Sequence, residues 1–413
     1  TTAPATQPLS LSVKSTGAVG DGKIKDTAAF QKALDTVAIS GGGEVLVPAG
    51  RYLIGSIQMG NRTLLRLDKG AMLVGSPDAA DYPSLDIRWE GRWQPGRRAL
   101  IYAANVDHIG IVGPSDGSAR IEGNAAMAAP QNPRGSVVLE PISCNFVRWE
   151  NFTVTQGGNW ATHPTYCNDV TIRNLTITGN RDGIDVDSCK DVTIDGCTLT
   201  TGDDCISLKS GRGLNGARIG RPTENVTITH CTMTDRTFAC IGIGSETSAG
   251  VRNVRISDCT MAAPRSAAIY IKTRIGRAGV TEGITATGLD ITAGSLLRIN
   301  LVSGGNTNTA DDPVEGPLGV PAARDLHFSD VRLNNAPSIA DVAQVSPDMP
   351  LENLSLVNIR GTAQKGIVLV NVKNAQVKDI AVTGLGGPLL ATQNSTGTGL
   401  EGATPYTPPA RGR

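Results

Sequence analysis

Apolar and polar residues alternate in many short runs along this chain. Three of these runs align without a gap, with apolar residues two positions apart, and they are Gly183–Ser188, Cys205–Ser210 and Ala268–Thr273. Such alternation over four to six residues, rich in Val, Ile and Thr and bounded by Gly, Asn or Asp, predicts short β-strands. The segment from Asp26 to Ala38 is the exception, because its apolar spacing predicts a helix with Asp26 at the N-cap.

A recurring five-residue pattern shows that the strands belong to a repeat. It reads Asn-Asp-Val-Thr-Ile at 168–172 and Lys-Asp-Val-Thr-Ile at 190–194, and it returns in related form at 224–228 and 252–256. The spacing from Val170 to Val192 is 22 residues (192 − 170), but the next one is 34 (226 − 192), so loops such as residues 211–223 are inserted between constant strands. Short parallel strands without long crossover helices predict an all-β, single-domain right-handed parallel β-helix with a short N-terminal helix as its cap.

Within this fold we expect residues 10–395 to form the β-helix catalytic domain. Residues 1–9 are expected to be a disordered or trimmed N-terminal tail, and residues 396–413 a C-terminal tail.

Equivalent residues on neighbouring coils of such a stack lie about 4.8 Å apart. Two inward apolar ladders follow from the alignment: Ile184, Ile206, Ile241, Ile269, Leu297, and Val186, Leu208, Ile243, Ile271, Ile299. Two outward columns are polar: Asp185, Ser207, Gly242, Tyr270, Arg298, and Asp187, Lys209, Gly244, Lys272, Asn300. Because folding does not require this polarity, function is expected on the outward columns.

Composition and charge narrow the possible partners. Lys+Arg and Asp+Glu both number 38, so no overall field favours nucleic acid or an anionic membrane. No apolar run approaches the ~18 residues of a membrane helix. We therefore expect no nucleic-acid or membrane partner, and a monomer. The polar, Pro-rich start without Met is interpreted as the trimmed end of a processed or recombinant chain, which is compatible with export, and we expect a secreted or periplasmic protein.

The eight cysteines recur at equivalent coil positions, as at Cys167 and Cys189. Buried Cys behaves as a small apolar residue, so we expect stacked free thiols rather than disulfides. The chain has no Cys-x-x-Cys pair, which makes a zinc site unexpected. Neither a metal nor a cofactor is predicted.

Three acids gather in one slot of the repeat. Asp182 and Asp204 occupy the same position of successive coils (204 − 182 = 22), and Asp203 lies beside them. Carboxylates this close cannot all be ionised, so one holds a proton while another stays charged. An acid beside a base is what the hydrolysis of a glycosidic bond requires. The alternatives are aspartates that cap turns and a calcium site.

Four motifs carry a resemblance to a known family. Asn180–Asp185 (NRDGID), Thr201–Ile206 (TGDDCI), Ile243–Glu246 (IGSE) and Ile271–Thr273 (IKT) resemble glycoside hydrolase family 28, the polygalacturonase family, in order and spacing. Residues 160–164 and 204–211 are similar to the bacterial branch, which includes exo-acting enzymes. The resemblance implies a right-handed parallel β-helix that cleaves α-glycosidic bonds of a pectic polysaccharide or oligosaccharide.

The resemblance also implies roles for single residues. Asp203 would be the general acid, while Asp182 and Asp204 would activate the attacking water and so invert the anomeric carbon. Lys272 would bind the sugar, often through its carboxylate. His163 and Lys209 would line the pocket, although His163 could instead cap a turn and Lys209 could be a surface partner of Asp187.

Two departures from the family pattern leave the substrate open. Thr237-Phe238-Ala239 stands where the family has Gly-His-Gly, and Tyr270 replaces an Arg. Phe238 and Tyr270 could form an apolar platform for a less charged sugar, as in rhamnogalacturonan hydrolases. Alternatively, Arg298, Arg274 or Arg181 could supply the missing positive charge.

Two other functions fit the same scaffold: a calcium-dependent pectate lyase, and a non-catalytic carbohydrate-binding solenoid. Residues 88–98, with two Trp and four Arg, are interpreted either as a sugar-binding loop that favours exo-action or as a loop packed on the flank of the fold.

Overall fold

A computed structural model of the chain describes residues 8–124, 136–157, 159–305 and 312–408. The chain divides into two compact units. Unit 1 comprises residues up to 88 together with 93–181, and unit 2 comprises residues 89–92 together with 182 onward.

Unit 1 is built from coils of short parallel strands. Its elements are β1 (Leu9–Ser12), β2 (Asp21–Lys25), α1 (Thr27–Ile39), β3 (Gly43–Val47), β4 (Gly50–Ile54), β5 (Ile57–Gln58), β6 (Thr63–Leu67), β7 (Ala71–Gly75), η1 (Ala79–Asp81), β8 (Ser84–Trp89), β9 (Arg92–Arg97), β10 (Ile101–Ala104), β11 (Asp107–Val112), β12 (Arg120–Glu122), β13 (Leu139–Ile142), β14 (Asn145–Glu150), β15 (Thr153–Thr155), β16 (Asn168–Arg173) and β17 (Thr176–Thr178). Strands β8 and β9 form a separate two-stranded sheet, and the other described strands pair in three parallel series: β1-β3-β6-β11-β14-β16, β2-β4-β7-β12-β15-β17 and β5-β10-β13. Three such series are the three faces of a parallel β-helix.

The predicted helix is α1, shifted by one residue. Its buried face packs against the first coils and consists of Phe30, Ala33, Leu34 and Val37. Asp26 is the N-cap residue, as predicted, but its side chain makes no hydrogen bond to the helix. Its carboxylate instead accepts from the backbone N–H groups of Val19 (2.6 Å) and Gly20 (3.0 Å), because the preceding turn competes for the same oxygens.

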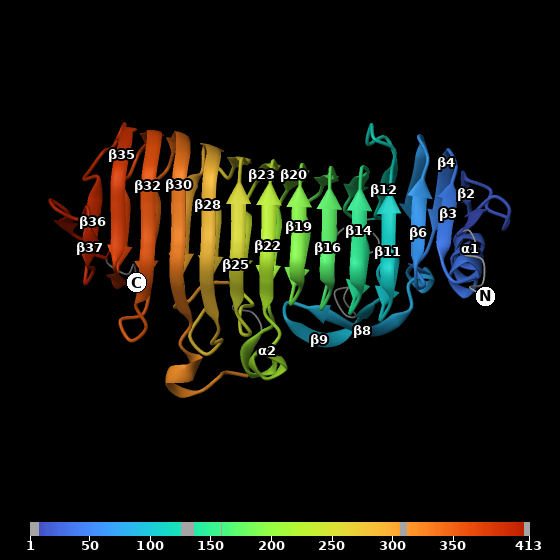
Figure 1. The fold of residues 1–413 in the computed structure, drawn as a ribbon, viewed down its shortest axis with the longest axis horizontal. Coiled ribbons are helices and arrows are strands. Elements are labelled where there is room, and N and C mark those ends of the chain that lie inside the picture. The colour runs from blue at the N-terminus through green and yellow to red at the C-terminus, as the bar shows by residue number, and fades with distance from the viewer. Residues whose placement is uncertain (1–7, 125–135, 158, 306–311, 409–413) are drawn as a thin grey trace, which may run out of the picture. The chain divides into compact units, whose positions relative to one another are not determined.

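Unit 2 is also built from coils of short parallel strands. Its elements are β18 (Ile184–Asp187), β19 (Lys190–Asp195), β20 (Thr198–Thr201), β21 (Ile206–Lys209), α2 (Gly213–Ile219), β22 (Thr223–Thr229), β23 (Thr232–Asp235), β24 (Ala239–Gly244), β25 (Val251–Ser257), β26 (Thr260–Ala262), β27 (Ala267–Lys272), β28 (Val280–Thr292), β29 (Ser295–Asn300), η3 (Gly316–Gly319), β30 (Ala322–Ala336), β31 (Ala340–Gln344), β32 (Leu351–Ala363), β33 (Ile367–Val370), β34 (Val372–Lys373), β35 (Ala375–Thr383), β36 (Leu390–Gln393), β37 (Gly397–Thr398) and β38 (Thr404–Pro405). Figure 1 shows β19, β22, β25, β28, β30, β32 and β35 side by side, and each pairs with the next in parallel.

The sheet that matters for function is β18-β21-β24-β27-β29-β31-β33-β36-β38. Its register confirms both predicted ladders, since Ile184 pairs with Ile206, Ile206 with Ile241, and so on to Leu297. Side chains of both ladders are at most 1% exposed.

The outward columns are less exposed than the sequence suggested. Asp185 and Ser207 are fully buried, and Lys209 is 4% exposed. The polar side chains at the start of these columns are therefore buried, and Lys209 pairs with Asp185 there (2.7 Å).

A second column repeats at the strand that opens each coil. Its residues have left-handed backbone angles, for example φ of 57° at Asp191, 57° at Asn225 and 55° at Asn253. Asn and Asp tolerate this conformation better than other non-Gly residues. Their side chains also bond along the stack, Asn225 Nδ2 to Asp191 Oδ1 at 2.7 Å and Asn253 Nδ2 to Asn225 Oδ1 at 3.2 Å. The column thus forms a polar ladder.

Further observations complete the fold. All eight cysteines are buried and free, as expected. Helix α2 was not predicted, because its seven residues lie in the inserted loop 211–223 and carry no apolar period. Strand pairing continues past residue 395, through β37 on β35 and β38 on β36. Among the described residues, no helix combines the length and apolar character needed to cross a membrane.

Candidate active site

Backbone pairing brings the three predicted acids together. The N–H of Gly183 donates to the carbonyl of Asp204 (3.0 Å), and the N–H of Ile184 donates to that of Cys205 (2.9 Å). Asp182 and Asp204 therefore stand side by side at the starts of β18 and β21. One carboxylate oxygen from each of Asp182, Asp203 and Asp204 lies within 4.8 Å of the others. Asp182 and Asp204 are 5% and 2% exposed, whereas Asp203 is partly exposed.

Two buried lysines hold two of these acids. Lys209 Nζ lies 3.1 Å from Asp182 Oδ2 and 2.7 Å from Asp185 Oδ1. Lys272 Nζ donates to Asp204 Oδ2 at 2.7 Å. The alternative of Lys209 as a surface residue is wrong, because its side chain is buried among the carboxylates. Each ammonium group stabilises the ionised form of the acid that it contacts.

The protonation of the cluster is uneven. Burial, followed by the charges of Asp182 and Asp204, raises the pKa of Asp203 to about 7. Burial also raises the pKa of Asp204, although Lys272 opposes this shift. The Asp203 carboxylate accepts a hydrogen bond from the backbone N–H of Asp204 (3.0 Å). Near neutral pH the cluster therefore offers a protonated carboxyl beside lysine-paired carboxylates.

Gly242 makes room for the Asp204 carboxylate. It lies between Ser207 and Tyr270 in the outward column. A Cβ atom at this position would come 2.1 Å from Asp204 Oδ2 and 2.5 Å from its Cγ. The sequence placed Gly242 in the outward column. Its close approach to the Asp204 carboxylate could not be predicted from the sequence.

Two further acids of the site were not predicted. Asp185 is fully buried against Lys209, and burial, then the charge of Asp182, raises its pKa well above the ordinary value. Its signal was its place in the motif 180–185. Asp235 ends β23, accepts from the N–H of Thr237 (2.9 Å), and has its pKa raised to about 7 by burial and then by Asp204. Nothing in the local sequence distinguishes Asp235 from a turn aspartate.

The predicted aromatic platform gathers at Lys272. The Lys272 ammonium lies 5.4 Å from the ring centroid of Phe238 and 5.5 Å from that of Tyr270. The Arg298 guanidinium lies over the same Tyr270 ring at 4.9 Å. Phe238 is 42% exposed, so a ring remains open to a ligand beside two cations.

Two other predicted residues have different surroundings. Arg274 donates through Nε and a terminal nitrogen to the carbonyl of Gly304, at 3.2 and 3.0 Å, and also to that of Gly305 at 2.7 Å. Its guanidinium is thus occupied by loop carbonyls. His163 belongs to unit 1, where it is fully buried with Nδ1 3.2 Å from Glu140 Oε1.

The Trp- and Arg-rich segment forms parts of β8 and β9, with some of its side chains buried and others exposed. Arg88 is fully buried, with its guanidinium 5.0 Å from the Tyr166 ring centroid. Trp93 stays 42% exposed, at 6.4 Å from the same ring.

A comparison with known families identifies the chain. The model of "Glycosyl hydrolases family 28" matches residues 41–294. This range includes the acids, both lysines, Phe238 and Tyr270. This chain belongs to glycoside hydrolase family 28. It is accordingly an inverting, polygalacturonase-like glycoside hydrolase.

Among known family relatives, a probable polygalacturonase of Vitis vinifera is 28% identical over 369 residues, covering 85% of this chain and 74% of that protein. A hyperthermoactive exopolygalacturonase of Thermotoga maritima has a TM-score of 0.72 at 22% identity, over 95% of this chain and 92% of its own. The family 28 exopolygalacturonase of Yersinia enterocolitica has a TM-score of 0.77 at 17% identity, over 95% and 78%. These likenesses confirm the right-handed parallel β-helix.

Proposed function

We propose that this family 28 enzyme is an exo-acting galacturonosidase that hydrolyses homogalacturonan or its oligosaccharides. The observation that carries the proposal is the acid cluster, in which a partly exposed carboxyl with a pKa of about 7 lies beside two lysine-paired carboxylates. General acid catalysis is most effective when the pKa of the acid lies near the working pH.

In this mechanism the Asp203 carboxyl gives its proton to the glycosidic oxygen as the bond from that oxygen to the anomeric carbon breaks. A water molecule attacks the anomeric carbon from the opposite face and passes a proton to the carboxylates of Asp182 and Asp204. Lys209 pairs with Asp182, and Lys272 pairs with Asp204 and opposes the rise of the Asp204 pKa that burial causes. The product is a sugar of inverted configuration.

The surroundings of Lys272 support a charged sugar. The ammonium of Lys272 and the guanidinium of Arg298 flank Tyr270, and either cation suits a uronate carboxylate. Arg274 is a weaker candidate for this role, because its donors already bond to Gly304 and Gly305. Exo-action is supported by the two exopolygalacturonases with the same fold. Since pectic polymers lie outside cells, we infer a secreted or periplasmic enzyme.

A rhamnogalacturonan hydrolase is the second candidate. It is favoured by Phe238, whose exposed ring stands where the family pattern has His, because an apolar ring suits a sugar without a carboxylate. A calcium-dependent lyase is less compatible with the site, because two ammonium groups already contact the acids that would bind the cation.

Leaving-group dependence tests the assigned roles. With trigalacturonate we expect Asp203→Asn, Asp182→Asn and Asp204→Asn each to lower kcat by about 10²–10⁴-fold. With an aryl galacturonide whose phenol leaves without protonation, Asp203→Asn should recover most of its activity, while the other two variants stay slow.

Equal loss for all three variants on the aryl substrate would contradict Asp203 as the acid. Parallel digestion of polygalacturonate and rhamnogalacturonan would decide the substrate, and early release of monomers rather than mixed oligomers would support exo-action.

A further inference from the structure

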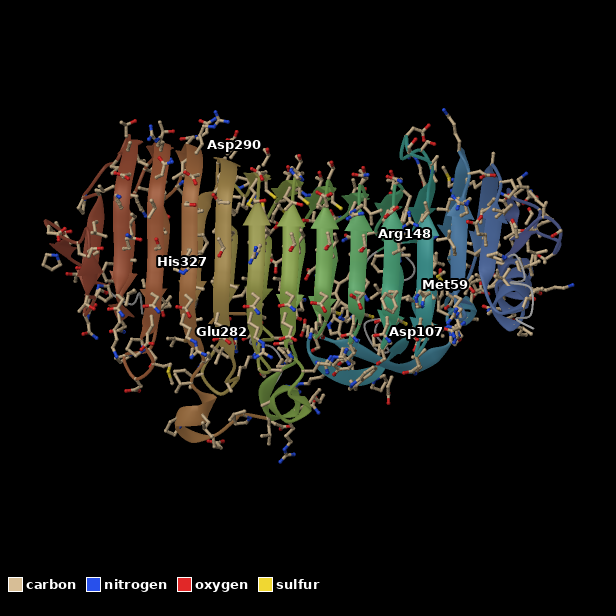
Figure 2. The ribbon with its side chains drawn as sticks, viewed as in Figure 1. Met59, Asp107, Arg148, Glu282, Asp290 and His327 are labelled. Atoms are coloured by element: carbon tan, nitrogen blue, oxygen red, sulfur yellow. The ribbon has the colours of Figure 1, made fainter. Side chains whose placement is uncertain are left out.

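A groove of about 570 Å³ lies on the outer face of β6, β11, β14 and β16, within unit 1. This volume falls in the range of ligand sites, about 300–1,000 Å³. Figure 2 labels Arg148 on this face of the sheet. None of the residues that line the groove belongs to the acid cluster, which is formed by residues from 182 onward.

The groove occupies the column where the left-handed polar ladder would be expected. In unit 2 this column holds Asp191, Asn225 and Asn253, but in unit 1 it holds Arg62, His108, Phe146 and Asp169, with φ of 55°, 56°, 55° and 53°. A bulky residue such as Phe is disfavoured at positive φ, and such outliers persist where the side chain has a use. Phe146 is also 49% exposed, so burial does not explain it.

Two rings of this column stack on one another in the groove. His108 and Phe146 stack with centroids 4.4 Å apart and planes 27° apart. Two residues further along the strands, Gly110 lies between Leu64 and Arg148. A Cβ at Gly110 would meet Leu64 Cδ1 at 2.8 Å and the Arg148 carbonyl at 3.0 Å. Glycine at this position lets Leu64 and Arg148 pack closely over the backbone, and Gly110 lines the groove beside the ring pair.

Guanidinium groups surround the rings. Arg62, Arg148 and Arg173 line the groove and are exposed. Arg148 pairs with Glu150 at 2.5 Å. The guanidiniums of Arg62 and Arg173 contact no partner among the residues that the structure describes, and both can bind a bidentate carboxylate. Three cations against Glu150 and Asp169 give the groove a net positive charge in a chain whose formal charge is zero.

We propose that this ring-and-arginine groove is a secondary binding site for de-esterified homogalacturonan. A polyuronate offers a carboxylate on every sugar for the spaced guanidiniums and apolar ring faces for the His108–Phe146 pair. A nucleic-acid backbone fits less well, because Glu150 and Asp169 would face its phosphates. The polymer's identity rests on the proposed function, whereas the charge and ring pattern of the groove does not.

Affinity electrophoresis tests the site without turnover. Asp203→Asn serves as the inactive reference, and the groove is altered by adding Phe146→Asn and Arg173→Gln. Asn suits the left-handed position, so folding should be retained, and Asp191→Asn in the same column of unit 2 is the matched control. In gels containing polygalacturonate we expect the groove variant to bind at least tenfold more weakly than the reference, and the control to bind equally.

Fully methyl-esterified pectin is the control ligand, because its sugars carry no free carboxylates for the arginines. The reference and the groove variant should therefore migrate alike in gels that contain it. Equal retardation of the reference and the groove variant by polygalacturonate would overturn the proposal. So would a groove effect of the same size on esterified pectin or on DNA.

In the active enzyme, Phe146→Asn with Arg173→Gln should lower kcat/KM for polygalacturonate several-fold and leave that for trigalacturonate unchanged. An equal loss on both substrates would contradict a separate polymer site. Absence of hydrolysis by the wild type would refute the proposed function alone, since the electrophoresis does not depend on it.

Discussion

Replacing Asp203 by asparagine should stabilise the folded protein at neutral pH while it removes activity. Burial and the neighbouring acids raise the pKa of Asp203 from 3.8 to about 7. Between pH 4 and 7 the unfolded chain releases this proton and the folded chain keeps it. The folded state therefore loses stability as the pH rises through this window.

The size of the effect follows from the shift. One pKa unit corresponds to about 1.4 kcal/mol, so a shift of about three units amounts to up to about 4 kcal/mol at pH 7. Asparagine has nearly the same shape and no charge, so the Asp203→Asn variant avoids this loss. Against a typical stability of about 5–15 kcal/mol, the gain is large enough to measure.

Urea denaturation of both proteins at pH 7 and about pH 4 is the assay. The variant should be the more stable protein at pH 7, and the difference should shrink towards pH 4, where Asp203 is protonated in both states. Asp330→Asn is the control: hydrogen bonds from Asn358 and Thr287 lower the pKa of exposed Asp330, so its replacement should not stabilise at pH 7. If Asp203→Asn were no more stable than the wild type at pH 7, the protonated-acid account would be refuted.

Three further outcomes are expected. Gly242→Ala should displace the Asp204 carboxylate, lowering the free energy of unfolding by about 1–3 kcal/mol and kcat by about 10²-fold. Gly387→Ala is the control: its added Cβ meets no atom within 4 Å, so neither quantity should change. Lys272→Met should lower the free energy of unfolding, measured with urea, by about 3–5 kcal/mol at pH 7. The loss should be smaller near pH 4, because a protonated Asp204 needs no cation beside it. The same loss at both pH values would contradict the pairing. The rate on trigalacturonate should fall about tenfold per pH unit above pH 7 as Asp203 deprotonates, and a plateau to pH 9 would exclude it as the acid.

The repeat made most of the fold predictable. The alternation of apolar residues indicated which side chains face inward. The ladder from Ile184 to Leu297 could therefore be predicted from the sequence. The coil spacing also placed Asp182 beside Asp204, since equivalent residues of a parallel stack lie one strand apart.

What could not be predicted depends on side-chain reach and on inserted chain. Lys209 was expected either to line the pocket or to pair with Asp187 at the surface, and its simultaneous contact with Asp182 and Asp185 is set by rotamers. Asp235 reaches the site from the end of another strand, and its sequence context is that of an ordinary turn. The surroundings of Arg274 depend on the loop at Gly304 and Gly305, which has no counterpart in the repeat.

The stereochemistry of hydrolysis tests the central claim most directly. The closest oxygens of the three acids lie within 4.8 Å, nearer than the ~6.5–9.5 Å common between carboxyl groups of inverting glycosidases, so the spacing alone would favour retention. Anomeric proton NMR of trigalacturonate during the first minutes of hydrolysis separates the two outcomes. The account predicts a saturated β-galacturonate that appears first and only later equilibrates with the α form. Initial α product, or an unsaturated uronide, would contradict water activation by Asp182 and Asp204.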